Sequence, residues 1–101
     1  MGINVELRDE SGAVLGSIPD SGMILSRFAS TTQAQSSPLL KHLDPAGDLV
    51  LNRSQAASLL AELPALIQAS TGPLRAALEG TRDLAEQCAG GTHIYLWFVG
   101  D

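Results

Sequence analysis

Few side chains in this chain could bind a soft metal ion or form a nucleophile–base pair: the candidates are His42, His93 and Cys88. None of them stands at the C-x-x-C or H-x-x-x-H spacing that places two ligands on one zinc ion. Cys88 and His93 could meet across the Gly90-Gly91 turn, but a thiol at the C-terminal end of a helix faces the end of the dipole that disfavours a thiolate. We therefore expect Cys88 to be a buried core residue, and we predict no catalytic residue, no metal site and no cofactor.

Two carboxylates, Asp44 and Asp48, flank Pro45-Ala46-Gly47 and could suggest a calcium loop or an acid–base pair. Calcium loops carry alternating ligands over about twelve residues and end in Glu, a pattern that this segment lacks. Turn formation, with each Asp side chain accepting nearby backbone N–H groups, explains them better. A Gly-x-Ser-x-Gly nucleophile elbow is also absent, but triads assemble in space. The sequence thus leans against an enzyme without deciding the question.

The aromatic residues are the most distinctive feature of the composition, because three of the four lie in the last seven residues before Gly100. The run 93–99 is apolar on both alternating faces, which predicts an internal strand rather than an edge strand. Tyr95 and Trp97 share one face of this strand, and Phe98 lies on the other. If helices cover only the Phe98 face, Tyr95 and Trp97 become an exposed aromatic pair of the kind enriched at binding hot spots.

The elements that would position these residues begin with strands. Residues 3–8 alternate strictly between apolar and polar, and residues 13–18 can return antiparallel after a turn at 9–12. Residues 23–29 are apolar enough for a third strand, which we favour over a short helix. A polar, uncharged and mobile loop is expected over 30–38.

A second hairpin is expected around the turn at 44–48, with short arms at 39–43 and 49–51. Asn52 and Gln55 then have the spacing of a capping box, and apolar residues three and four apart follow to Ile67. A second helix is expected to begin near Pro73 and to end at Gly90-Gly91. The sequence predicts an α+β fold: a mainly antiparallel sheet of about five or six short strands, a two-helix hairpin packed on one face, and an internal C-terminal strand.

Length and charge limit the classes of function. A chain of 101 residues that is 45% hydrophobic and 17% charged predicts one folded domain over residues 1–101. Its net charge of −5 repels phosphate backbones, and its six basic residues are scattered, so nucleic-acid binding is not expected. A single cysteine, no basic-then-apolar leader and no long apolar window predict a cytoplasmic protein that does not bind membranes.

Two segments carry a resemblance. Residues 43–55, a hairpin turn leading through Asn52 and Gln55 into a helix, and residues 93–101, an aromatic strand closing in Gly-Asp, resemble a group of small uncharacterised bacterial α+β proteins. The two segments cover about a fifth of the chain, and no activity or functional residue comes with the resemblance. By size and acidity the chain is also similar to immunity proteins that neutralise toxins, an analogy at the level of the whole domain.

Three functions from different classes remain open. The leading hypothesis is a non-catalytic protein-interaction module, in one version an immunity-like domain that neutralises a basic partner, with Tyr95 and Trp97 as the contact residues. The second is a small-ligand binder or enzyme with a pocket near the 30–38 loop, where Arg27, His42 or Tyr95 would supply polar contacts. The third is a structural homodimer that joins two sheets by a face or an edge.

Overall fold

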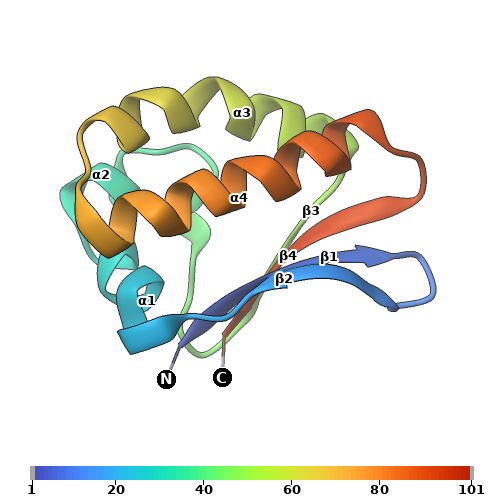
Figure 1. The fold of residues 1–101 in the computed structure, drawn as a ribbon, viewed down its shortest axis with the longest axis horizontal. Coiled ribbons are helices and arrows are strands. Elements are labelled where there is room, and N and C mark those ends of the chain that lie inside the picture. The colour runs from blue at the N-terminus through green and yellow to red at the C-terminus, as the bar shows by residue number, and fades with distance from the viewer. Residues whose placement is uncertain (1, 101) are drawn as a thin grey trace.

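The strands form a sheet that carries helices on one side only, as Figure 1 shows. The structure is a computed structural model and describes residues 2–100. The strands are β1 (Ile3–Asp9), β2 (Val14–Ile18), β3 (Asp48–Leu51) and β4 (Ile94–Gly100). The α-helices are α1 (Ile24–Ala29), α2 (Thr32–Gln35), α3 (Arg53–Gln68) and α4 (Gly72–Gly90), and short 3-10 turns cover 21–23 and 40–42.

The sheet has the order β2-β1-β4-β3, and every neighbouring pair is antiparallel. The prediction that the C-terminal strand is internal is confirmed, because β4 lies between β1 and β3. The predicted hairpin of residues 3–8 and 13–18 is present as β1 and β2. The register places Val5 opposite Phe98 and Glu6 opposite Trp97, so the two central strands turn their apolar rows to the same side.

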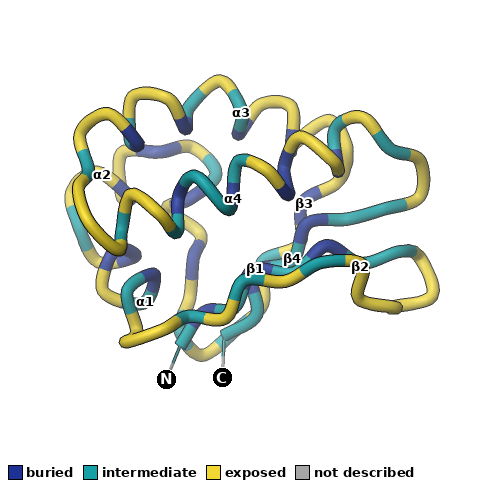
Figure 2. Tube along the Cα trace, viewed as in Figure 1, coloured by how far each residue is buried: buried dark blue, intermediate teal, exposed yellow. Residues whose placement is uncertain are grey.

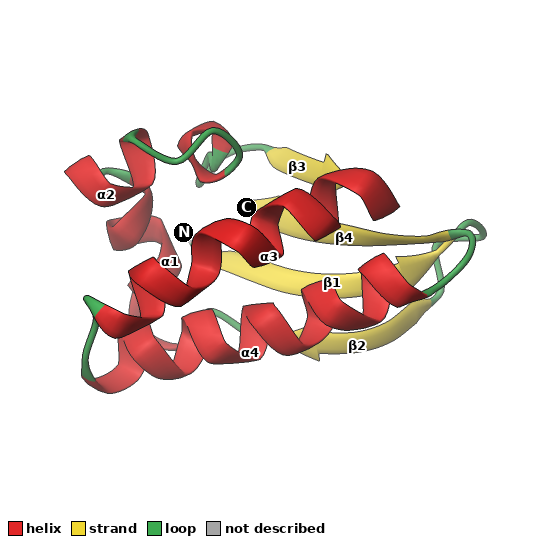
Figure 3. Ribbon diagram, turned by 90° about the horizontal axis from the view of Figure 1, so that it is seen from above, coloured by secondary structure: helices red, strands yellow, loops and turns green. Residues whose placement is uncertain are grey.

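The core lies between this sheet and the two long helices, α3 and α4, which run side by side above it (Figures 1 and 3). The short helices α1 and α2 gather beyond one end of the strands. Dark-blue buried positions face each other across this layer in Figure 2. The apolar rows of the central strands and the inward helix faces are buried there: Ile3, Val5, Leu7, Leu96 and Phe98 from the sheet, and Ala56, Leu59, Leu63, Leu78, Leu84, Ala85 and Cys88 from the helices.

The expected capping box at the start of α3 is confirmed. The Asn52 side chain accepts the Gln55 N–H at 2.9 Å, and the Gln55 side chain accepts the Asn52 N–H at 3.0 Å. These two bonds satisfy backbone donors that have no partner within the first turn of a helix. The end of α4 at Gly90 also agrees with the predicted stop.

Four strands are present in the described residues rather than five or six, and two short helices accompany the predicted pair. The prediction of a strand over 23–29 is wrong, because residue 23 ends the 3-10 turn and residues 24–29 form α1. Its buried residues, Leu25, Phe28 and Ala29, are spaced three and four apart, and a strand would have divided them between two faces. The 30–38 segment, predicted to be a loop, contains the short helix α2, whose first turn is capped by the Thr31 hydroxyl accepting the Ala34 N–H at 3.3 Å.

The second hairpin does not form as predicted. Residues 40–42 are a 3-10 turn, in which the three-residue spacing brings Leu40 and Leu43 into the same core. The partner of β3 is therefore β4, and the 44–47 turn packs against the end of that strand. There the Gly100 N–H donates to the Gly47 carbonyl at 2.9 Å, and a Cβ at Gly100 would collide with backbone atoms of the turn. The two segments that carry the sequence resemblance thus meet in space.

Asp20 joins the start of the sheet to the first helix. Its carboxylate accepts the N–H groups of Ile3 at 2.7 Å, Leu25 at 3.0 Å and Ser26 at 3.2 Å. The Asp20 N–H in turn donates to the Asn4 side chain at 2.8 Å. One side chain therefore satisfies backbone donors from two elements that are far apart in sequence.

We expect Asp20→Ala to lower the free energy of unfolding by about 2–3 kcal/mol, because it leaves these part-buried N–H groups without a partner. Chemical denaturation followed by circular dichroism measures this change. Asp44→Ala is the matched control, since the Asp44 side chain accepts a single exposed N–H, that of Ala46, and its loss should cost under about 1 kcal/mol. Equal losses in the two variants would contradict the role assigned to Asp20.

Candidate functional site

No helix of the described residues covers the second face of the sheet, as Figure 1 shows. The register determines which side chains share it: Arg8 stands opposite Tyr95, Glu6 opposite Trp97, and Val50 on the other flank of Trp97. We call this surface the open sheet face. Its residues are Asn4, Glu6 and Arg8 of β1, Val14 and Ser17 of β2, Asp48 and Val50 of β3, and Tyr95, Trp97 and Val99 of β4.

A stacked cluster occupies the centre of the open sheet face. The Arg8 guanidinium carbon lies 4.3 Å from the centroid of the Trp97 ring, within the range of a cation–π contact. The Glu6 carboxylate holds Arg8 in place, at 2.7 Å from Nε and 2.5 Å from the second nitrogen. All three side chains are only partly exposed, so this cluster presents a pre-ordered aromatic surface rather than a freely moving ring.

Both outer strands add exposed apolar side chains to the sheet. Val50 of β3 is 40% exposed beside Trp97, and Val14 and Leu15 of β2 are 53% and 54% exposed. A bulge between Leu7 and Arg8 shifts the register at this end of β2. No charged residue or proline lies within Val14–Ile18, so the bulge and the short length of β2 are the features that limit pairing at this edge.

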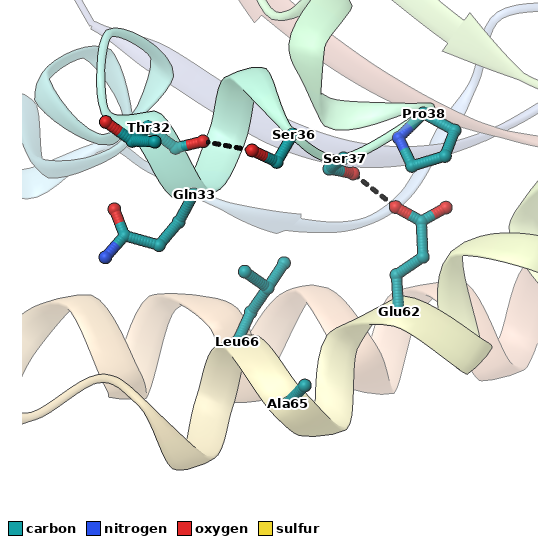
Figure 4. A pocket seen from close by; sticks show the side chains of 8 residues that line it. All are labelled: Thr32, Gln33, Ser36, Ser37, Pro38, Glu62, Ala65 and Leu66. Atoms are coloured by element: carbon teal, nitrogen blue, oxygen red, sulfur yellow. Dashed lines mark hydrogen bonds between the residues drawn. The ribbon is translucent and has the colours of Figure 1, made fainter.

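A second candidate site lies where α2 and the following turn approach α3. This α2–α3 cavity measures about 430 Å³, and its walls come from residues 32, 33 and 36–38 and from Glu62, Ala65 and Leu66 of α3. Figure 4 shows Leu66 pointing towards the 32–38 segment and Glu62 reaching Ser37. The Ser37 hydroxyl donates to the Glu62 carboxylate and accepts the Leu40 N–H at 3.1 Å, which fixes the carboxylate at one end of the cavity.

The polar contacts expected for a ligand pocket do not gather at this cavity. Arg27 is exposed on α1 and lines a separate cavity of about 480 Å³ with Phe28 and Leu74. His42 is exposed in the 40–42 turn and lines neither cavity. Tyr95 lies on the open sheet face. The cavity instead offers the Gln33 amide and the Glu62 carboxylate, which sequence reasoning missed because α2 and α3 meet only in the tertiary structure.

Cys88 and His93 have separate environments. Cys88 is fully buried in the core and its thiol donates to the Ile94 carbonyl at 3.5 Å. Burial raises the pKa of the Cys88 thiol, which is the opposite of the shift that activates a nucleophile. His93 is exposed with φ of 58°, and its Nδ1 lies 3.4 Å from the Glu10 carboxylate.

We expect the Cys88 thiol to react with a thiol reagent such as DTNB only when the protein unfolds, because both burial and the raised pKa suppress the thiolate. The folded protein binds the thiol proton more tightly than the unfolded chain does. Stability should therefore fall as the pH rises through the ordinary thiol pKa towards the raised value. Stopped-flow labelling in increasing denaturant measures the reactivity, and rapid labelling of the native protein would contradict this assignment.

Asp44 and Asp48 do not form a paired site. Asp44 accepts the Ala46 N–H at 2.8 Å and its carbonyl accepts the Gly47 N–H at 3.2 Å, as a turn residue does. Asp48 belongs to β3, opposite Val99. Within residues 2–100 no three His, Cys, Asp or Glu side chains converge as a metal site would require. None of the helices described has both the length and the apolarity needed to cross a bilayer.

Comparison of the chain with models of known protein families, with curated proteins and with solved structures found no match. The open sheet face and the α2–α3 cavity are therefore the two features of the molecule that bear on its function.

Proposed function

We propose that this protein is a non-catalytic protein-interaction module that docks a basic protein partner on the open sheet face. An immunity-like role, in which the domain neutralises that partner, is one specific version. The observation that carries the proposal is the placement of Trp97 and Tyr95 with Val50 on a sheet face that no described helix covers. Tryptophan and tyrosine are among the residues that supply most of the binding energy at protein interfaces, and a neighbouring apolar side chain helps to exclude water from them.

The charge of the molecule favours a basic partner. The chain carries a net charge of −5, and the open sheet face follows the same sign. Its charged residues are Glu6, Arg8 and Asp48, and the single cation among them is already paired with Glu6. Asp9 and Glu10 extend the negative potential to the hairpin beside the face. Complementary potentials of this kind speed the encounter with a basic protein and discriminate against acidic ones.

The order of the Arg8–Trp97 cluster also supports binding at this face. A ring held between Arg8 and its neighbours loses little conformational freedom when a partner covers it. The entropy cost of association is then smaller than for a flexible surface side chain. Trp97 is consequently the residue at which we place the centre of the interface.

The test introduces the photo-crosslinker p-benzoylphenylalanine at position 50 on the open face and at position 61 on the exposed surface of α3, in cells of the source organism. We expect one basic protein to be cross-linked from position 50 and not from position 61. The partner is then purified and its affinity measured by calorimetry. Trp97→Ala, checked for folding by circular dichroism, should weaken binding by about thirtyfold, as loss of a hot-spot residue of about 2 kcal/mol implies.

Two variants that each add one positive charge test the same face without changing Trp97, so a folding defect caused by Trp97→Ala does not affect this test. Val50→Lys places a cation on the open face, whereas Ala61→Lys adds the same charge on the helical side. We expect only Val50→Lys to weaken the complex, because a basic partner would be repelled there. Cross-linking of the chain to its own copy through position 50 would instead support the homodimer, and equal loss in both variants would contradict the proposed face.

The α2–α3 cavity supports a second candidate function, the binding of a small molecule. Its walls combine the apolar surfaces of Pro38, Ala65 and Leu66 with the polar groups of Gln33 and Glu62. A mainly apolar concavity with a few oriented polar groups is the usual form of a ligand site. The buried Ser37 hydroxyl holds the Glu62 carboxylate in one orientation, which suits a ligand with an apolar body and a cationic or hydrogen-bonding head.

We expect a ligand of this cavity to raise the melting temperature of the wild-type protein in a fragment screen, and to lose its effect when Ala65→Trp fills the space. Ala65 is exposed on α3, so the larger side chain should leave the fold intact. Ala61→Trp, one turn earlier on the same helix and outside the lining, is the control. Hits that stabilise all three proteins equally would contradict a ligand site here.

A further inference from the structure

A cavity of about 320 Å³ lies at the hairpin end of the open sheet face, distinct from the α2–α3 cavity. Tyr95 and Trp97 of β4 and Val50 of β3 form its apolar wall. Residues 9, 10 and 12 of the β1–β2 turn form its remaining side. Two aromatic residues and two acidic residues thus line one concavity.

The carboxylate of Asp9 is locked in place by its own turn. One of its oxygens accepts the Ser11 N–H at 2.9 Å, the Ser11 hydroxyl at 2.6 Å and the Ala13 N–H at 3.0 Å. These hydrogen bonds lower the pKa of Asp9, so this carboxylate remains charged throughout the neutral range. The Asp9 carboxylate at the cavity is therefore held in one position and stays negatively charged.

The second carboxylate, Glu10, is exposed and lies 3.4 Å from His93 Nδ1. This contact is weak because both side chains are open to solvent, and a stronger cation could replace it. No lysine or arginine is among the residues that line the cavity. The cavity consequently presents two carboxylates and two aromatic rings with no basic residue in its wall.

On the open sheet face, an aromatic ring already binds a guanidinium group. The Trp97 ring holds the Arg8 guanidinium at 4.3 Å, while Glu6 supplies the counter-charge. A planar guanidinium can stack on a ring and bind a carboxylate through two N–H groups at once, which an ammonium group cannot do. Beside the ring that Arg8 already occupies, the cavity adds Tyr95 and two further carboxylates, and no arginine or lysine is among the residues that line it.

We propose that this cavity receives an arginine side chain of the partner protein, stacked on Tyr95 beside the Arg8-bound ring of Trp97 and paired with Glu10 and Asp9. The inference rests on the proposed function, and it assigns the recognised residue type to that interaction. The net charge of −5 attracts a basic surface, and the cavity then selects the arginine on it. The neighbouring Val50 supplies the apolar contact for the side-chain stem.

The chain has a single tryptophan, so the fluorescence of Trp97 reports directly on this face. The probe is a hexa-arginine peptide, titrated at low and at moderate ionic strength, with hexalysine and hexaglutamate as comparison peptides. We expect a saturable change in Trp97 emission with hexa-arginine, at least about threefold weaker binding of hexalysine, and no change with hexaglutamate.

Two variants with the same charge change separate the cavity from general electrostatics. Glu10→Gln should weaken hexa-arginine binding by about fivefold, as loss of one charge-assisted contact implies. Asp83→Asn removes one negative charge from the exposed surface of α4 and should leave the affinity within about twofold, as expected for a distant screened charge. Tyr95→Leu, which keeps an apolar residue in β4, should also weaken binding.

The outcomes distinguish this inference from the proposed function. An unchanged Trp97 emission with hexa-arginine, or equal weakening by Glu10→Gln and Asp83→Asn, would overturn the arginine site. If cross-linking from position 50 still yields a basic partner in that case, the interaction module stands and only its recognised residue is wrong. Saturable, Glu10-dependent binding of hexa-arginine supports the site, even where cross-linking finds no protein and the proposed function fails.

Discussion

One-sided burial of the sheet is the constraint on which the rest of this structure depends. β1 and β4 each carry an apolar row that α3 and α4 cover, and these rows account for most of the sheet's contribution to the core. In a domain of this size two layers bury most of the apolar surface, and the described helices all serve that core, so none of them covers the opposite face. The same register that buries Phe98 beneath the helices places Trp97 on the open sheet face, between Val50 of β3 and Glu6 of β1.

The polar contacts of the fold keep this arrangement in register. Asp20 binds backbone N–H groups from both β1 and α1, and the Gly100 N–H closes the far end of β4 on the 44–47 turn. Because a shift of one residue would exchange the two faces of a strand, such contacts also protect the composition of the open face. Stability and the proposed binding surface are therefore coupled through the same strands. Within the β1–β2 turn, Asp9 accepts the N–H groups of Ser11 and Ala13 and so positions the loop that lines the cavity beside Tyr95.

Part of this could be predicted from local patterns. Three local patterns correspond to observed elements, because each depends on neighbours in sequence. They are the alternation of residues 3–8, the capping box at Asn52, and the run 93–99, which is apolar on both faces. The failures were short apolar segments, 23–29 and 39–43, where five to seven residues fit a strand or a helical turn equally well. Their conformation was decided by contacts with distant elements: Asp20 and β1 for the first, and the shared core of Leu40 and Leu43 for the second.

The candidate sites divide in the same way. The sequence by itself determined that Tyr95 and Trp97 share one face of a strand, because side chains alternate with a period of two. It also determined the acidity of the surface and the burial of Cys88 on an apolar helix stripe. Only the tertiary structure decided that no described helix covers the Trp97 face, that Arg8 stacks on its ring, and that Glu10 and Asp9 share its cavity. These are contacts across strands and turns, which depend on strand order and register, and no local pattern contains that information.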